Sequence, residues 1–366
     1  MKKMILMAAV AAVAMSSCTN DENYFEDVKT PISFTPAAKV HQSRAIISSS
    51  EFPIQSGFGA NAWLGKNTDG SNTQVYMKDV IISHKQDNSW KPETAYNWPP
   101  ITGATLDFFC YAPETVKPTM GTSLNDPKTL TYTGITVDPT AATTNANDVD
   151  ILYSDKAVNA TSTNCSRGVP VKFNHALSTL AFKVLASTLE QENTIEGNKI
   201  KYEVKVQSIK LSKIVTKGNL TMKVGNTEGD HLKTTTWEKP ENEIWESSVS
   251  DEDKKDYTIS SDVTLRTDEA QPFGDTRIVL PQVLKGISAT VKYTIKTTIG
   301  EVFSEDSHET SFNLTAMNSA LTHWQMGKAI VYAITFNPTN TLQPITFKPS
   351  VNEWGVANGA SYSNSK

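Results

Sequence analysis

The side chains that could act as nucleophiles or metal ligands are dispersed along this chain of 366 residues. The sequence has no HExxH, GxSxG, CxxC, GxGxxG or phosphate-loop motif, each of which would set reactive groups at a working spacing. No two of its six histidines lie at ligand spacing; they are His41, His84, His175, His231, His308 and His323. The sequence therefore predicts a protein that is not an enzyme and holds no metal or cofactor, although the dispersed carboxylates of a glycosidase would escape such a search.

Two carboxylates lie two residues apart in the segment NDVD, at Asp148 and Asp150. Such pairs occur in calcium loops, but the glycine and the distal glutamate of an EF-hand loop are missing here. We therefore expect a solvated entry to a strand, with calcium binding as the less favoured alternative.

The first cysteine follows a segment that has the pattern of an export signal. A positively charged start and an apolar run over residues 4–15 precede Ser16, Ser17 and Cys18. The run is too short to span a bilayer as a helix. Small residues directly before a cysteine resemble a bacterial lipoprotein signal, and the alternative is an ordinary secretory signal with a chance cysteine. We expect residues 1–17 to be the signal peptide and Cys18 to be the site of lipid attachment, where each buried CH₂ contributes about 0.8 kcal/mol.

The other two cysteines have no obvious reactive role. Cys110 lies in the apolar segment LDFFCYAP and is expected to be a small buried hydrophobe. Cys165 lies in a polar stretch. An oxidising compartment would permit a disulfide between them, but we favour two unpaired thiols.

Several aromatic residues could in principle bind sugars. Trp90 and Trp98 lie near the turn at Pro99 and Pro100, where aromatic side chains more often close the end of a sandwich core than line a sugar platform. Trp237 and Trp245 lie in a polar insertion and are the better candidates for exposed contacts.

The elements that must position these residues are strands, because apolar and polar residues alternate with a period of two. Residues 290–299 place Val291, Tyr293 and Ile295 on one face, and residues 328–336 follow the same pattern. Residues 201–211 also alternate, with a change of phase near Ser208. Half-buried strands of this kind are typical of antiparallel sheets with one wet face. Helical patterns are sparse, and a short turn of helix within residues 315–325 is the most that we expect.

Length and charge limit the architecture and the partners. The hydrophobic core of a single domain stops growing at about 250–300 residues, so the length of this chain favours two domains. The strand pattern restarts after a polar stretch at residues 159–167, which we take as the boundary. The net charge of −5 argues against a nucleic-acid partner.

An ordered set of segments resembles the fimbrillin-like (Mfa-like) family of Bacteroidales lipoproteins, whose members build type V pili. The matching segments run through nearly the whole mature chain. They are ISF at 32–34, SRA at 43–45, WKPETAYNWP at 90–99, LDFFCYAP at 106–113, DVDILYS at 148–154, VKFNHALSTLAFKV at 171–184, IKLSKIVTKGNL at 209–220, WQMGKAIVYAITF at 324–336, ITF at 345–347 and VNEW at 351–354. Cys110 and Ala329 depart from the residue types usual in the family.

The resemblance implies an all-β fold of two tandem transthyretin-like antiparallel β-sandwich domains. With it we expect a tether and pro-strand over residues 18–44, an N-terminal domain over 45–167 and a C-terminal domain over 168–366. It also implies cleavage by a trypsin-like protease between Arg44 and Ala45. Loss of the first strand would then open a groove for a strand of another subunit.

The resemblance further implies a donor strand near the C-terminus. Its candidate residues are Ile345, Phe347, Val351 and Trp354. The implied partners are other pilus subunits, outer-membrane lipid through Cys18, and a host or bacterial glycan or protein receptor. The expected location is the outer membrane or cell surface, as a lipid-anchored precursor of a pilus.

Three functions remain open from the sequence. We favour a structural or adhesive pilus component, either a shaft or a tip subunit. The second possibility is a surface lipoprotein that binds glycans without polymerising, and the third is an unrecognised hydrolase.

Overall fold

The computed structural model describes the chain in segments, which together contain nearly all of the expected strands. They are residues 30–38, 52, 57–65, 74–120, 129–138, 150–154, 157–192, 197–223, 235–237, 254–317, 321–340 and 345–353.

Two five-stranded sheets pack face to face in the C-terminal half of the chain. One contains β11 (Ser178–Ala186), β17 (Gln271–Pro272), β18 (Arg277–Val279), β21 (Lys328–Phe336) and β22 (Ile345–Glu353). The other contains β12 (Glu190–Glu192), β13 (Lys199–Val215), β16 (Lys254–Thr264), β19 (Ser288–Ile299) and β20 (Val302–Asn313). Leu180 and Tyr332 of the first sheet join Val206 and Val291 of the second in one buried cluster, so these sheets form a sandwich.

The N-terminal half contains a sheet that closes on itself. Its strands are β1 (Phe34–Ala38), β2 (Phe58–Gly65), β3 (Gln74–His84), β4 (Trp90–Pro92), β5 (Thr105–Ala112), β8 (Leu152–Ser154), β9 (Ala157–Ala160) and β10 (Val169–His175). The hydrogen-bonded order is β2-β3-β4-β1-β10-β8-β5-β9, and β5 also pairs with β2. All of these strands except β9 therefore form a closed ring, and β1 is one of the strands of this ring.

Strand β5 is buried on both faces, which explains why its sequence is almost continuously apolar. Phe108 and Cys110 point into the core of the ring, whereas Phe109 and Tyr111 belong to a second cluster. A further sheet contributes to this second cluster. It has the order β15 (Thr235–Trp237), β14 (Lys217–Lys223), β7 (Thr129–Thr136) and β6 (Thr119–Met120).

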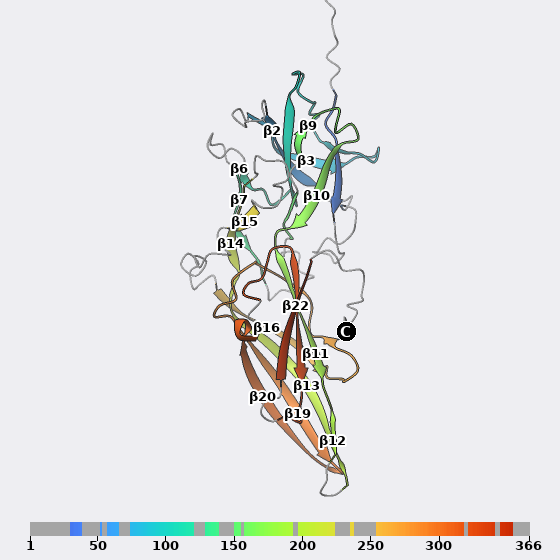
Figure 1. The fold of residues 1–366 in the computed structure, drawn as a ribbon, viewed down its shortest axis with the longest axis vertical. Coiled ribbons are helices and arrows are strands. Elements are labelled where there is room, and N and C mark those ends of the chain that lie inside the picture. Colours follow the sequence, from blue (N-terminus) through green and yellow to red (C-terminus); the bar gives the residue numbers. More distant parts are fainter. Residues whose placement is uncertain are drawn as a thin grey trace, which may run out of the picture.

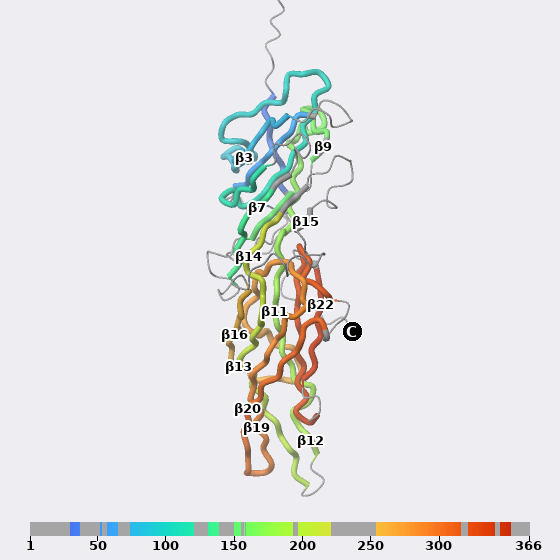
Figure 2. The backbone as a smooth tube through the Cα atoms, turned by 90° about the vertical axis from the view of Figure 1, so that its left-hand side faces the viewer, coloured from blue at the N-terminus to red at the C-terminus, as the bar shows by residue number. Residues whose placement is uncertain are grey.

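The second cluster joins the two halves of the elongated molecule. Trp63 and Tyr132 from the N-terminal half share it with Ile278 and Leu280 from the C-terminal half. Strands β2, β3 and β9 lie toward one end of the long axis, and strand β12 and the turn between β19 and β20 lie toward the other (Figures 1 and 2). Strand β14 follows β13 in sequence but pairs with β7, so the chain crosses back to the N-terminal half.

The structure confirms the all-β fold class and several local predictions. Val291 and Tyr293 are buried, and the phase change near Ser208 is a β-bulge, since the register of β13 shifts between Val206 and Ser208 against both neighbours. The expected helical turn is α2 (Leu314–Met317). None of the helices in the described segments has the length and apolarity needed to cross a membrane.

Two pairings differ from the expected antiparallel arrangement. Strands β1 and β10 are parallel, and so are β11 and β21. Parallel neighbours require a long connection between them, and in both pairs more than a hundred residues intervene. The alternation of apolar and polar residues within one segment does not indicate which distant strand it pairs with.

The division into domains at residue 167 stays a prediction. Strand β10 lies just beyond that point in sequence, yet it pairs with β1 and β8 of the ring. Strands β14 and β15 also lie beyond it and belong to the sheet that contains β7.

Candidate assembly site

The backbone of the first described segment is hydrogen-bonded along both sides. On one side, β1 runs parallel to β10 from Phe34 opposite Val169 to Ala38 opposite Phe173. On the other side, the Ile32 amide donates to the Tyr96 carbonyl at 2.8 Å, and the Trp98 amide donates to the Thr30 carbonyl at 2.9 Å. Residues 30–38 therefore fill a slot between the segment 90–98 and β10.

The side chains of this segment complete the core of the ring. Ile32 and Phe34 are only 1% and 2% exposed. The Phe34 ring meets Phe58 and Phe108 edge to face, with centroid distances of 5.7 and 5.6 Å. Full burial of such a side chain contributes about 1.5–3 kcal/mol.

Removal of this segment would have two physical consequences. The backbone groups of residues 90–98 and 169–173 would lose their partners, and Phe58 and Phe108 would line an apolar slot. Unpaired strand edges beside an apolar slot are the features that accept a strand from another chain. The arrangement is chemically suited to strand replacement.

The predicted processing and lipidation sites cannot be placed in this geometry. Arg44, Ala45 and Cys18 lie outside the described residues. Phe52 is described, and it packs against Phe58, Trp90 and Phe173 in the core of the ring. The chain between Ala38 and Phe52 therefore starts at a strand of the ring and ends at a residue of its core.

The structure brings part of the predicted donor segment into the C-terminal sandwich. Strand β22 forms the edge of its sheet and pairs with β21 from Ile345 opposite Phe336 to Glu353 opposite Lys328. Ile345 and Phe347 are buried, and Val351 is 43% exposed. The Phe347 ring lies 5.1 Å from Tyr332 and 5.4 Å from Phe312. Trp354 lies outside the described residues.

The two cysteines among the described residues are both free thiols. Cys110 is buried in the core of the ring, and its amide donates to Ser154 Oγ at 2.8 Å. Burial raises the pKa of the Cys110 thiol well above its usual range, and burial also raises the pKa of the Cys165 thiol. Both thiols are therefore poor nucleophiles, since the thiolate is the reactive form.

The tryptophans considered for sugar binding mostly have structural contacts. Trp90 is buried against Phe52 and Phe58, and Trp98 packs against Phe108 at a centroid distance of 5.9 Å. The preferred core role of this pair is confirmed. In β15, Trp237 pairs with Leu220 through its backbone, and Trp245 lies outside the described residues.

Sequence reasoning missed a buried contact between Asp150 and His175. The Asp150 carboxylate lies 2.9 and 3.2 Å from His175 Nδ1, and both side chains are almost completely buried. The expectation of a solvated Asp150 was therefore wrong, because the imidazole of a residue 25 positions away lies within hydrogen-bonding distance of the buried carboxylate. Asp148 lies outside the described residues, and within the described residues no three acidic, histidine or cysteine side chains gather as a metal site.

Comparisons with known proteins agree with the resemblance seen in the sequence. The sequence model of the fimbrillin-like family matches residues 43–354, which confirms that resemblance. A crystal structure of a fimbrial protein from Bacteroides vulgatus is similar in fold, with a TM-score of 0.58 at 17% identity over 88% of this chain and 99% of that chain. The tip fimbrial protein Mfa3 from Porphyromonas gingivalis, truncated at its C-terminus, gives a TM-score of 0.38 at 12% identity over 89% of this chain and 100% of that chain. A search of curated proteins finds no match.

Proposed function

Because this chain belongs to the fimbrillin-like family, we propose that it is a structural or adhesive subunit of a cell-surface pilus. In this proposal it is exported as a lipoprotein through Cys18, is anchored in the outer membrane as a precursor, and joins other subunits as a shaft or tip component. The chain has no catalytic role in the proposal, in keeping with a family of fimbrial proteins.

The observation that supports strand exchange best is the position of β1 inside a closed ring. An edge strand could leave without opening anything, but β1 separates β4 from β10 and supplies Ile32 and Phe34 to the core. We propose that cleavage between Arg44 and Ala45 frees residues 18–44, which include β1. The vacated slot then accepts the donor strand of another subunit.

We propose that the donor is the C-terminal segment that includes Ile345, Phe347, Val351 and Trp354. Strand β22 alternates buried Ile345 and Phe347 with exposed Thr346 and Lys348. The slot between the segment 90–98 and β10 requires the same alternation, since Ile32 and Phe34 are buried and Ser33 is more exposed. We retain two domains, residues 45–167 and 168–366, as part of the proposal.

The test compares purified full-length protein with a chain that begins at Ala45. We expect the shortened chain to form ladders that resist sodium dodecyl sulfate, because strand exchange buries a whole strand and reverses slowly. The full-length protein should assemble only after treatment with a protease that cuts after arginine.

The matched control separates cleavage at Arg44 from cleavage elsewhere. Arg44→Ala should block protease-triggered assembly, whereas Arg167→Ala, at an exposed arginine, should leave it intact. Equal assembly of the shortened chain, the untreated full-length chain and Arg44→Ala would refute the processing step.

A further inference from the structure

Strand β20 is a long open edge of the C-terminal sandwich, and its turn with β19 lies at the end away from the ring (Figure 1). In the sheet order β12-β13-β19-β20 it is terminal, and β19 is its one neighbour among the described strands. Its 12 residues extend about 40 Å. Residues Val302 to Glu309 are exposed on both faces, so much of the strand lies beyond the sandwich core.

The apolar side chains of this edge gather at the turn between β19 and β20. Val302 is 74% exposed, Phe303 63% and Ile299 36%. These three make up most of the large exposed apolar side chains in the described part of the chain. Lys296 Nζ lies 4.8 Å from the centre of the Phe303 ring, which leaves the rest of that ring available to a partner.

Side chains of opposite charge lie next to each other on neighbouring strands of this sheet, and the last side chain in each such row is an acid of β20. Glu203 of β13 lies opposite Lys296 of β19, which lies opposite Glu305 of β20. Four residues further along β20, Glu309 lies opposite Lys292. Opposite charges on neighbouring strands stabilise a sheet, so the next position in each row favours a lysine or an arginine.

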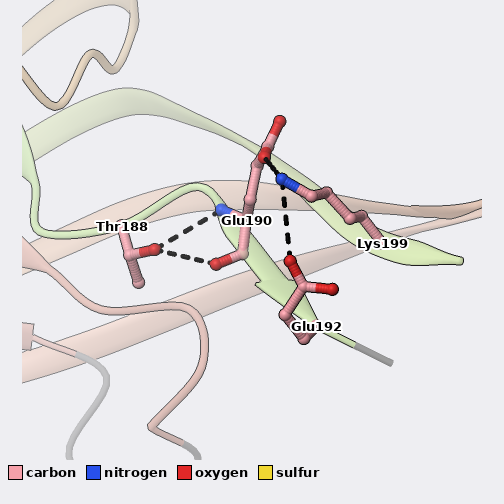
Figure 3. Close-up of polar contacts among 4 residues, drawn as sticks. All are labelled: Thr188, Glu190, Glu192 and Lys199. Atoms are coloured by element: carbon pink, nitrogen blue, oxygen red, sulfur yellow. Dashed lines mark hydrogen bonds and ion pairs between the residues drawn. The ribbon is translucent and has the colours of Figure 1, made fainter. Parts of the chain in front are cut away.

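At the other edge of the same sheet, the acidic side chains of β12 have a basic side chain of the neighbouring strand β13 as their partner. At β12, Lys199 Nζ lies 3.1 Å from Glu190 and 3.7 Å from Glu192, and Thr188 closes the turn through the Glu190 backbone (Figure 3). That edge is three residues long and its basic partner is intramolecular. Strand β20 is four times as long and has no lysine or arginine of its own.

We propose that β20 is a docking edge for a basic extended segment of another protein, which adds to the sheet as a further strand. The segment that fits has two basic residues four apart on one face, opposite Glu305 and Glu309, and an apolar residue opposite Phe303. Antiparallel pairing with a second copy of β20 centred on Ser307 is disfavoured, because it would place Glu305 opposite Glu309. This edge is separate from the slot of β1, so the inference does not depend on strand exchange.

The experiment titrates purified protein with synthetic nine-residue peptides and measures affinity by calorimetry and amide protection by hydrogen exchange. In the first probe peptide, threonine alternates with the residues that would face β20, which are valine, lysine, threonine and lysine in that order. The second probe peptide has these residues in the reverse order. The control peptides have glutamate in place of lysine. We expect a lysine peptide to bind at least about tenfold more tightly than its glutamate counterpart at low salt, with slower exchange over residues 302–313.

Charge reversal of the edge tests the pairing directly. The double variant Glu305→Lys/Glu309→Lys should lose the lysine peptide and bind the glutamate peptide, whereas Asp268→Lys/Glu269→Lys, at two exposed acids elsewhere, should behave as the original protein. Equal affinity for both peptides, exchange in β20 unchanged by the lysine peptide, or dimerisation of the protein through β20 would each overturn the proposal.

Discussion

At the scale of residues, Gln282 connects two segments of the C-terminal half through buried hydrogen bonds. Its Oε1 accepts from the Val215 amide at 2.9 Å, and its Nε2 donates to the carbonyls of Val215 and Leu280 at 3.2 and 3.1 Å. The side chain thereby pairs with the end of β13 as a neighbouring strand would.

Gln282→Leu should lower the free energy of unfolding by about 2–4 kcal/mol, because it leaves the buried amide and carbonyl of Val215 without these partners. Urea denaturation followed by circular dichroism measures the loss. Gln271→Leu is the matched control, since Gln271 Oε1 is already buried without a partner and its removal should cost little. Similar losses in both variants would contradict the role of Gln282.

Buried tyrosines make the fold sensitive to alkaline pH. Burial raises the pKa of Tyr332 to about 12, and it also raises the pKa of Tyr111 and Tyr132. An unfolded tyrosine ionises near pH 10, so the free energy of unfolding should be constant below that pH and fall as pH rises through 12.

Circular dichroism and tyrosinate absorbance, recorded from pH 8 to 12.5, check this expectation. The Tyr332 contribution to the loss should be about 3 kcal/mol, and Tyr332→Phe should flatten the pH dependence by that amount. Ionisation of every tyrosine near pH 10 without unfolding would show that the hydroxyls are not protected.

At the scale of elements, β1 is anchored in the ring mainly by the contacts of one side chain, Phe34. Phe34 contacts Phe58 and Phe108, whereas the next residue, Thr35, is exposed. Phe34→Ala should therefore destabilise the protein by about 3–5 kcal/mol, and Thr35→Ala by less than about 1 kcal/mol. Urea midpoints of the two variants give the comparison, and comparable losses would mean that β1 is not seated through Phe34.

Local alternation predicted the strands within residues 201–211, 290–299 and 328–336 but not their partners. The change of phase near Ser208 coincides with a bulge, because a bulge changes which residues face the core. The pairing of β1 with β10 and of β14 with β7 depends on residues far apart in sequence. The same limit explains why the Asp150–His175 contact was missed, since its two members have no shared motif.

At the scale of the whole molecule, the closed ring and the C-terminal sandwich are joined by a shared buried cluster. The ring contains the slot of β1, and the sandwich contains the candidate donor β22 and the open edge β20. Removal of β1 would open the ring, while the pairing of the sandwich strands does not involve β1. In the proposed function, assembly opens the ring, and the sandwich gives up only its edge strand β22 to another subunit.

The central claim is that the assembled form has lost its first strand, and the mature N-terminus tests it most directly. Mass spectrometry of SDS-resistant polymers and of the monomeric membrane fraction should find a free Ala45 in the polymers and a lipidated Cys18 in the membrane fraction. Polymers that retain a lipidated Cys18 together with residues 19–44 would contradict the claim, because β1 would still fill the slot between β4 and β10.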